Sequence, residues 1–544
     1  MIKLVIIGLD GATFRVIKPL CAEGKLPNLN RMITQGAHGI LESTFPPVTG
    51  PAWSAMATGK NPGKTGIFDS LIRINKETFE TRLVSSMDIK RAKPYWDYLS
   101  DAGIRTGVVN YPFLYPPYKL NGIMGSGLGS DPRDEIFYPR EFKQLILNKC
   151  GHYQIHLPWY GSEYARNPQL FLDHVFALLE INNKTAKLLL DSNLQMLTFV
   201  ISASDFAQHY MWRYFDPSHP YYYEEEARKY KDAFIQIWQK IDKILGSTMQ
   251  ALPENANIII TSDHGFGAHQ STFYTGSWLE KEGYLHKRIW PIRARKLQGI
   301  AAELVRRISP YLHRKLVRAA RSGRMTIIQA TSEIDFTRSL ALPLDNASLV
   351  GEICINRQAA SFKSHSSDFE VIREEIIEKL EETCRNLGVQ VKVHSPYELY
   401  SGRYVDLAPD ILFDIEDGEC SVRFGFGRKL YQKPPPTPFH SGIHKKEGIF
   451  IAYGPDIEQG HEIDDAKIYD IAPTILHMSG LPVPDDIDGI VLKEIFREGS
   501  ELAKREVKYN KVDVERERVR DRIKKLKERS KLSKGGNTSP HQRR

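Results

Sequence analysis

Three apolar runs of this 544-residue chain each end at or just before an aspartate. They are LVIIGLDG with Asp10, LTFVISASDFAQH with Asp205 and His209, and NIIITSDHG with Asp263 and His264. Such runs predict buried strands of a parallel sheet, whose carboxyl ends meet along one edge. That edge would gather carboxylates and imidazoles without cysteine, a donor set that suits zinc, manganese or another first-row ion better than calcium. The number of ligands favours two metals over one.

The order of the predicted elements indicates the fold class. Strand-like runs at 3–8, 106–110, 196–202 and 257–261 alternate with helical stretches. This alternation predicts an α/β fold with a doubly wound, mostly parallel sheet that carries helices on both faces. A hydrophobic content of 41% supplies the apolar residues that one large core needs.

The chain divides into a catalytic body and three additions. Residues 1–285 and 330–500 are expected to form one discontinuous catalytic domain. Within it, residues 111–193 are rich in Pro, Tyr and Gly and then helical, and we interpret them as an insertion that contributes to a cap over the site or as structural padding. Residues 286–329 are expected to be a basic amphipathic helical insertion, and 501–544 a charged, partly disordered tail.

Two segments carry the positive charge of the chain. Residues 287–324 contain 12 basic residues and one acidic residue, and residues 501–544 contain 16 and 7, so that the overall charge of +8 leaves −12 on the rest. The acidic body argues against nucleic acid as a partner. The 287–324 segment interleaves apolar and basic residues at helical spacing, which favours a helix that binds an anionic membrane surface. The alternative is an inserted helical hairpin whose basic face is simply solvated.

Cysteine usage and hydropathy indicate the compartment. The five cysteines are widely spaced and form no CxxC pair, which is typical of reduced thiols. No apolar run approaches the ~18 residues that cross a bilayer, and the opening MIKLVIIGLDG is too short for a secretory signal. The sequence therefore predicts a cytoplasmic protein that is peripheral to the membrane if 287–324 binds lipid.

A stretch rich in hydroxyls and small residues, STFPPVTGPAWSAMATG, follows the first predicted strand and helix. A hydroxyl beside a divalent cation loses its proton more readily than one in water, because the cation stabilises the alkoxide. Thr49, followed by Gly50 and Pro51, is the best candidate for such a nucleophile. Spacing alone leaves four competitors: Ser43, Thr44, Ser54 and Thr58.

Several motifs occur in an order that is specific to one family. They are GLDG, PPVTGPAW with TGKNPGKTGIFD, SASDFAQH, TSDHGFG, SGIHKKEGIFIAYGP and YDIAPTILHMSGLPVPDDIDG. The chain resembles the type I phosphodiesterase/nucleotide pyrophosphatase family of the alkaline phosphatase superfamily. The resemblance implies an alkaline-phosphatase-like fold and a phosphoric ester hydrolase that acts on a small-molecule phosphoester. It also implies two divalent ions, usually Zn²⁺, with Mn²⁺ as the alternative.

The same resemblance assigns roles to individual residues. It gives one ion the ligands Asp205, His209 and His444, and the other ion Asp10, Asp263, His264 and Thr49. Thr49 would also be the nucleophile that forms a phosphothreonine, which water then hydrolyses. Independently of the resemblance, Asp205 and His209 lie four residues apart, so they share one face if a helix follows the strand.

The resemblance leaves the roles of three further residues open. His440 precedes His444 by four residues, but the family pattern of a glycine on either side, here Gly442 and Gly448, favours His444. His440 and His269 are then expected near the substrate or behind the ligands. Asp69 stands close to the position where the family often has an asparagine that holds a phosphoryl oxygen. A carboxylate would repel that oxygen, so this role is not assigned to Asp69.

Two other functions remain open from the sequence. The first is a phosphotransferase that moves a phosphoryl or phospho-alcohol group to a lipid or glycan hydroxyl, which the 287–324 segment would hold at a membrane. The second is a non-catalytic basic binding protein with a vestigial site. All six predicted protein ligands besides Thr49 are present, which favours an enzyme.

Overall fold

The structure is a computed structural model that describes residues 2–73, 79, 81–157, 163–164, 167–288, 334–344, 349–359, 362, 369–437 and 440–512. Apart from a few residues at its edges, the predicted basic insertion lies outside the described residues. The tail beyond residue 512 does so as well. Their expected roles stay predictions. In the described part of the chain, no helix combines the length and the apolar character that a membrane crossing requires.

Nine strands of the described chain form the main sheet. In spatial order they are β20 (His461–Lys467), β2 (Ala37–Glu42), β19 (Glu447–Tyr453), β9 (Asn257–Thr261), β1 (Leu4–Leu9), β8 (Met196–Ile201), β5 (Thr106–Tyr111), β6 (Gly122–Ser126) and β7 (Phe137–Tyr138). Strands β19 and β7 run antiparallel to their neighbours, and the other pairs are parallel. The predicted α/β class with a mostly parallel sheet is confirmed.

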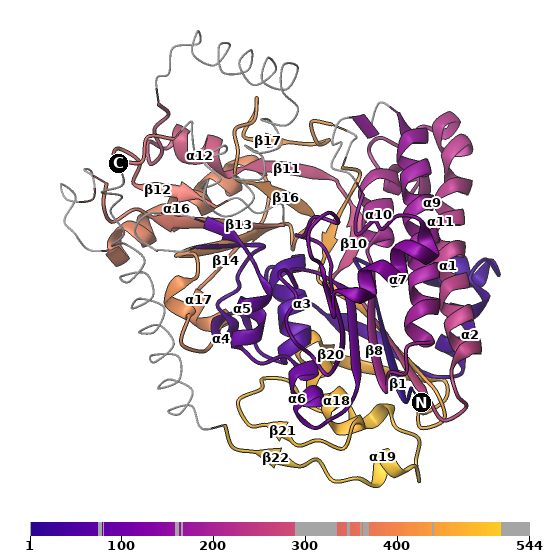
Figure 1. Ribbon diagram of the computed structural model, residues 1–544. Coiled ribbons are helices and arrows are strands. Elements are labelled where there is room, and N and C mark those ends of the chain that lie inside the picture. Colours follow the sequence, from indigo (N-terminus) through magenta and orange to yellow (C-terminus); the bar gives the residue numbers. More distant parts are fainter. Residues whose placement is uncertain are drawn as a thin grey trace, which may run out of the picture.

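Helices cover both faces of this sheet (Figure 1). One layer contains α1 (Phe14–Ala22), α2 (Pro27–Thr34), α7 (Glu141–Cys150), α9 (Pro168–Leu190), α10 (Ala203–Phe215) and α11 (Glu224–Ala251). The other contains α3 (Thr49–Thr58), α4 (Pro62–Thr65), α5 (Ser86–Arg91), α6 (Tyr95–Asp101) and α18 (Ile471–Met478). The sheet therefore separates two hydrophobic cores.

The central strand β1 shows why its sequence is continuously apolar. Val5, Ile7 and Leu9 belong to one core, whereas Leu4 and Ile6 belong to the other. Successive side chains of a strand point to opposite faces, so a strand that is covered on both sides needs apolar residues at every position.

Most of the described part of the 111–193 segment lies in the body of the fold. It supplies β6 and β7 to the main sheet and α7 and α9 to one helical layer. Phe171 and Val175 of α9 are buried in the core beside that layer. The cap function that the sequence suggested for this segment stays a prediction.

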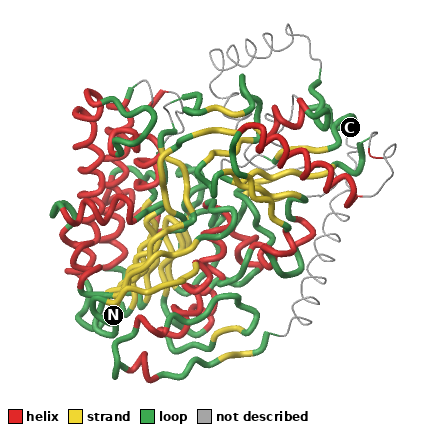
Figure 2. Tube along the Cα trace, turned by 180° about the vertical axis from the view of Figure 1, so that it is seen from behind, coloured by secondary structure: helices red, strands yellow, loops and turns green. Residues whose placement is uncertain are grey.

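A second lobe has sheets and a core of its own, at the upper left of Figure 1 and the upper right of the reverse view in Figure 2. Its four-stranded sheet has the order β12 (Ala341–Pro343), β13 (Val350–Ile355), β15 (Ile411–Ile415) and β14 (Val391–His394), and its three-stranded sheet the order β16 (Cys420–Arg423), β11 (Ser271–Tyr274) and β17 (Tyr431–Gln432). Its helices are α12 (Thr275–Lys281), α16 (Phe369–Leu387) and α17 (Pro396–Leu399). The hydroxyl of Tyr400 donates to the Phe45 carbonyl at 2.8 Å and so ties this lobe to the loop before α3.

Short elements complete the described chain. The antiparallel pair β10 (Gly265–Ala268) and β18 (Gly442–Lys445) joins the site to the second lobe. The other short elements are β3 (Leu71–Arg73), β4 (Thr81–Leu83), β21 (Val483–Pro484), β22 (Tyr509–Asn510), α19 (Glu501–Lys504), and the 3-10 helices η3 (Val405–Leu407), η4 (Ile468–Asp470) and η5 (Lys493–Ile495).

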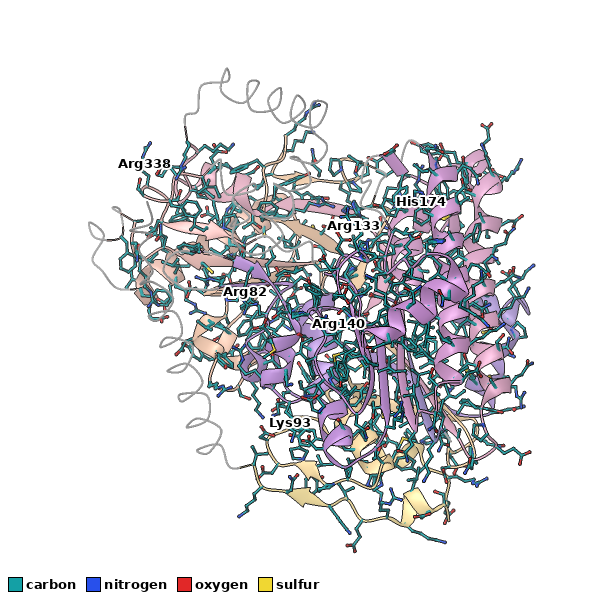
Figure 3. The ribbon with its side chains drawn as sticks, in the orientation of Figure 1. Arg82, Lys93, Arg133, Arg140, His174 and Arg338 are labelled. Carbon is teal, nitrogen blue, oxygen red and sulfur yellow. The ribbon has the colours of Figure 1, made fainter. Side chains whose placement is uncertain are left out.

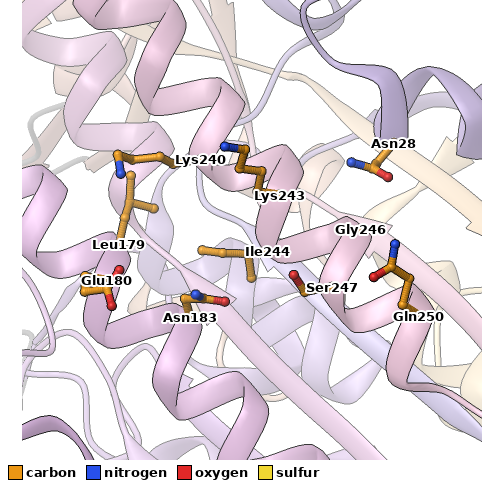
Figure 4. A pocket seen from close by; sticks show the side chains of 10 residues that line it. All are labelled: Asn28, Leu179, Glu180, Asn183, Lys240, Lys243, Ile244, Gly246, Ser247 and Gln250. Atoms are coloured by element: carbon orange, nitrogen blue, oxygen red, sulfur yellow. The ribbon is translucent and has the colours of Figure 1, made fainter.

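A polar groove of about 360 Å³ lies between α9, α11 and the start of α2 (Figure 4). Asn28, Lys240, Lys243 and Ser247 are among the residues that line it. Lys240, Lys243 and Ser247 belong to the half of α11 that leads into β9. The groove therefore lies toward the amino end of β9. The aspartates that follow the strands are at the opposite edge of the sheet, and the groove is therefore separate from them.

Candidate metal centre

The three predicted aspartates converge because their strands end level with one another. In the register of the parallel pairs, Leu9 lies opposite Ile201 and Gly8 opposite Thr261. Asp10 follows β1, Asp205 lies in the first turn of α10 after β8, and Asp263 follows β9. The carboxyl edge of the sheet therefore collects three carboxylates, as the sequence predicted.

One group of ligand atoms combines α10 with the β18 strand. The Nε2 atoms of His209 and His444 lie 3.4 and 3.5 Å from Asp205 Oδ1 and 3.1 Å from each other. Asp205 and His209 share one face of α10, as their spacing indicated. We call Asp205, His209 and His444 the helix group.

A second group lies deeper at the strand ends. His264 Nε2 is 3.3 Å from Asp263 Oδ2 and 3.7 Å from Asp10 Oδ1. We call Asp10, Asp263 and His264 the strand group. The two groups touch, since the rings of His264 and His444 stack with centroids 3.6 Å apart. His264 can also combine with Asp205 and His444, because their ligand atoms all lie within 4.8 Å of one another.

Backbone carbonyls set the orientation of all three imidazoles. The Nδ1 atom lies 3.0 Å from Gly442 O in His209, 3.1 Å from Gly265 O in His264, and 3.1 Å from Pro47 O in His444. A carbonyl can only accept, so Nδ1 carries the proton and donates it. The unprotonated Nε2 atoms then face the carboxylates, which is the arrangement found in metal-binding histidines.

Buried polar atoms without partners show that these residues fit a cation. Asp10 Oδ1, Asp205 Oδ1, Asp263 Oδ2 and His264 Nε2 are inaccessible to solvent and have no hydrogen-bond partner among the described residues. Leaving such atoms unpaired costs about 1–3 kcal/mol each, and more for charged groups. A divalent ion between them would satisfy these oxygen and nitrogen donors together.

The carboxylates of the two groups have opposite pKa shifts. Burial raises the pKa of Asp263 to about 7. Burial, followed by the charges of Asp263 and Asp205, raises the pKa of Asp10 well above its ordinary value. Burial also raises the pKa of Asp205, but the charges of His209 and His444 outweigh it, and the net shift is downward. The surroundings of the strand group therefore disfavour ionised carboxylates unless a cation balances their charge.

Thr49 is the first residue of α3 and directly follows a loop that contacts both ligand groups. Ser43 Oγ in the preceding loop donates to the Asp263 carbonyl, and the Pro47 carbonyl accepts from His444. The loop is thus attached to both ligand groups immediately before Thr49. A Cβ on Gly50 would come within 2.8 Å of the Ser70 backbone, so glycine allows the chain to pass closely at this point.

Hydrogen bonding distinguishes Thr49 from its four competitors. The hydroxyl groups of the competitors all donate to backbone carbonyls: Ser43 to Asp263, Thr44 to Pro46, Ser54 to Gly50 and Thr58 to Ser54. The hydroxyl of Thr49 has no hydrogen-bond partner among the described residues, and the residue is only partly buried. It is therefore the hydroxyl that remains available for chemistry.

The family profile of type I phosphodiesterase / nucleotide pyrophosphatase matches residues 4–429. The chain belongs to this family. Membership confirms the predicted family and the alkaline-phosphatase-like fold, and it supports phosphoester hydrolase activity toward small-molecule phosphoesters. The match includes all of the predicted ligands except His444, which the structure alone adds to the cluster. No curated protein matches the chain.

The remaining predicted residues lie around the cluster of this phosphodiesterase-family site. His440 lies outside both ligand groups, and its ring contacts those of His209 and Tyr210 with centroids 5.5 and 5.7 Å apart. His269 is engaged at both nitrogens, with the His440 carbonyl at 2.8 Å and the Thr272 hydroxyl at 2.9 Å. These contacts give His269 a supporting position behind the ligands.

Asp69 is buried close to the start of α3, and its carboxylate accepts the Ser70 N–H. A Cβ on Gly50 would lie 2.9 Å from the carbonyl oxygen of Asp69. The backbone at Asp69 therefore packs closely against Gly50, the residue after Thr49. The structure thus places Asp69 near Thr49, and the Asp69 carboxylate already accepts a hydrogen bond within its own loop.

Sequence reasoning missed the backbone groups that shape the centre. The N–H of Gly11 donates to Asp263 Oδ1 at 3.1 Å, and Gly11 has a positive φ of 66°. A Cβ there would come within 2.6 Å of the Phe266 ring. The glycine after Asp10 in the GLDG motif was the available signal, because both the left-handed conformation and the close ring favour glycine. The carbonyls of Pro47 and Gly442 left no such signal in the sequence.

Proposed function

We propose that this phosphodiesterase-family protein hydrolyses phosphodiester or pyrophosphate bonds with Thr49 as a covalent nucleophile. The observation that carries the proposal is the Thr49 hydroxyl, which has no partner among the described residues and directly follows a loop bonded to both groups of buried, unpaired ligand atoms. Thr49 is the first residue of α3, where helix N–H groups lack partners within the helix. These donors and the positive end of the helix dipole favour a phosphoryl group at that position.

Two divalent cations, zinc or alternatively manganese, fit the donor set of the centre. The helix group would hold one ion, and the strand group with Thr49 would hold the other. Once bound, such cations stabilise a deprotonated hydroxyl and the charge that develops on the phosphoryl oxygens. The neutral Nε2 atoms of the histidines and the carboxylates are the ligands that this requires.

The residues of the chain then account for two displacement steps. Thr49 Oγ forms a bond to phosphorus, and the ester oxygen departs with the bonding electrons and takes up a proton. A water molecule next attacks the phosphothreonine, and Thr49 Oγ leaves and regains its proton. Each step is an in-line displacement, so the configuration at phosphorus is retained overall.

We also propose that residues 1–285 and 330–500 act as one catalytic domain. His264 comes from the first part and His444 from the second, and their rings stack within the same cluster. Neither part alone supplies both ligand groups. This supports the discontinuous domain that the sequence suggested.

Hydrolysis of bis(p-nitrophenyl) phosphate with added zinc or manganese tests the nucleophile. We expect Thr49→Ala to lower kcat/KM by about 10³-fold or more, whereas Thr49→Ser retains a hydroxyl and much of the activity. Thr44→Ala is the matched control, because its hydroxyl only bonds to the carbonyl of Pro46 in the same loop. Mass spectrometry of acid-quenched enzyme should find a phosphoryl adduct on the Thr49 peptide. Full activity of Thr49→Ala would refute the assignment.

A further inference from the structure

Arg423 lies on a strand that connects the second lobe with the metal centre. It is the last residue of β16 and pairs with Tyr274 at the end of the parallel strand β11. The chain reaches β11 directly from His264 through β10 and the turn that contains His269. Strand β11, with which Arg423 pairs, thus continues the segment that supplies the ligand His264.

A chain of contacts leads from the strand pair that carries Arg423 to the helix group. Thr272 and Tyr274 lie on the same face of β11, and Tyr274 pairs with Arg423. The Thr272 hydroxyl lies 2.9 Å from His269 Nε2, and His269 Nδ1 lies 2.8 Å from the His440 carbonyl. His440 contacts the ring of His209 and therefore lies at the boundary of the ligand cluster. Arg423 therefore lies on the sheet face that these contacts join to the centre, where a substrate that extends beyond the ligands would meet it.

Arg423 is partly buried, yet it has neither an ion pair nor a hydrogen bond to any described residue. Burial lowers its pKa, and the one favourable charge effect comes from the Tyr274 phenol. Other arginines of the molecule, such as Arg82 and Arg133 in Figure 3, pair with the neighbouring carboxylates of Asp88 and Asp131. Taking a guanidinium out of water without a counter-charge is costly, which is a reason to expect an anionic ligand.

The chemistry of the guanidinium limits what this ligand can be. Its planar fork of N–H donors matches the two oxygens of a carboxylate or the oxygens of a phosphate. The nitrogens of His269 are already engaged by the His440 carbonyl and the Thr272 hydroxyl, and an imidazole carries no negative charge, so neither histidine provides a counter-charge for Arg423. A neutral alcohol would leave Arg423 unpaired, and a cationic alcohol would be repelled.

We infer that Arg423 binds a second anionic group of the substrate, a carboxylate or a phosphate, beyond the phosphoryl group that reacts. The inference rests on the proposed function, because the second group must belong to a phosphoester held at the same centre. It defines the substrate class as phosphoesters that carry additional negative charge, and it excludes neutral and choline-like alcohols as preferred components.

A series of p-nitrophenyl phosphodiesters tests this specificity. The second alcohol would be 2-carboxyethyl, 2-phosphonoethyl, neutral 2-hydroxyethyl or cationic 2-trimethylammonioethyl, with nitrophenolate released in every case. We expect the wild type to prefer an anionic over the neutral member in kcat/KM, and the carboxylate and phosphonate arms separate the two sources of charge. In Arg423→Met, we expect this ratio to fall by about 10- to 100-fold, as for a lost charge-assisted hydrogen bond.

The ratio of kcat/KM for an anionic diester to kcat/KM for the neutral diester is measured within one enzyme preparation. It is therefore independent of the fraction of the protein that is folded. Arg423→Lys keeps the charge without the fork and should retain part of the preference. Arg428→Met is the matched control, because Arg428 is exposed on the segment just after β16, and its ratio should equal that of the wild type. No anionic preference in the wild type, or an unchanged ratio in Arg423→Met, would overturn the inference. Failure to hydrolyse any member of the series with zinc or manganese would instead refute the proposed function.

Discussion

The two ligand groups of the centre are built from different kinds of structure. Asp10 and Asp263 follow central strands and are 3% and 1% exposed, and His264 is fully buried. In the helix group, by contrast, the side chains of Asp205 and His209 are 16% and 21% exposed. The strand group is fixed by the core of the sheet, whereas the helix group lies on the more solvent-exposed side of the centre.

Because their surroundings differ, the carboxylates of the two groups also differ in their pKa values. Burial raises the pKa values of Asp10 and Asp263, and the charges of nearby carboxylates add to the rise: Asp263 and Asp205 act on Asp10, and Asp205 acts on Asp263. Ionised carboxylates are therefore unfavourable in the strand group without a cation. The histidines beside Asp205 lower its pKa instead. We expect the strand group to depend more strongly on its cation, and the helix group to exchange its cation more freely.

Loss of a strand-group carboxylate should have the largest effect. We expect Asp263→Asn to lower kcat/KM by about 10³-fold or more and to remove close to one ion per chain, because the amide supplies no anionic donor. His209→Asn should cost about 10- to 100-fold, since Asp205 and His444 remain. Kinetics and elemental analysis of the two variants provide the measurement. Equal losses in both would show that the groups do not differ in this way.

Removal of metal should occur in two phases. A chelator added to the two-zinc protein should take the ion of the helix group first, because its ligands are partly exposed, and the ion of the strand group more slowly. A zinc indicator followed over time would resolve the two rates. In His209→Asn the fast phase should disappear or accelerate beyond detection, whereas the slow phase persists. A single rate in the wild type would contradict the distinction.

The strand group could be predicted from the sequence because the signal is local. Each apolar run is a strand and each aspartate follows it, and parallel strands that end level bring such residues together whatever the loops do. The same reasoning predicted the mostly parallel sheet. The second lobe was not foreseen as a separate unit, because short strands such as β12 and β14 have little periodicity and its core forms from residues far apart in the chain.

The helix group and the surroundings of Thr49 depended on contacts that the sequence does not record. Nothing local shows that His444, rather than His440, approaches Asp205, and the family pattern was needed to choose between them. The free hydroxyl of Thr49 became distinct only when its competitors were found bonded to carbonyls. Arg423 had no motif at all, since its significance lies in the partner that it lacks.

The stability of the metal-free protein should fall as pH rises. The folded state retains the Asp263 proton up to about pH 7, whereas an unfolded chain releases it near pH 4. Between these values the folded state binds more protons, so the stability contribution is complete below about pH 4 and is lost by about pH 7, with a size of up to about 4 kcal/mol. Urea unfolding across this range would measure it. The slope should be smaller in Asp263→Asn, where the buried Asp10 still titrates in the same direction, and it should be suppressed by saturating zinc. A slope of the same size in Asp263→Asn would assign it to other groups.

The smallest effect concerns the loop that connects the groups with Thr49. The Ser43 hydroxyl bonds to the Asp263 carbonyl on the strand side, and the Pro47 carbonyl accepts from His444 on the helix side. Ser43→Ala should therefore lower stability by about 1 kcal/mol, the usual contribution of one hydrogen bond. It should also lower kcat by less than about 10-fold, because the helix-side bond still holds the loop. Thr44→Ala loses a bond that lies wholly within the loop, so it should lower stability alone, and equal kcat values for the two variants would show that the strand-side bond does not position Thr49.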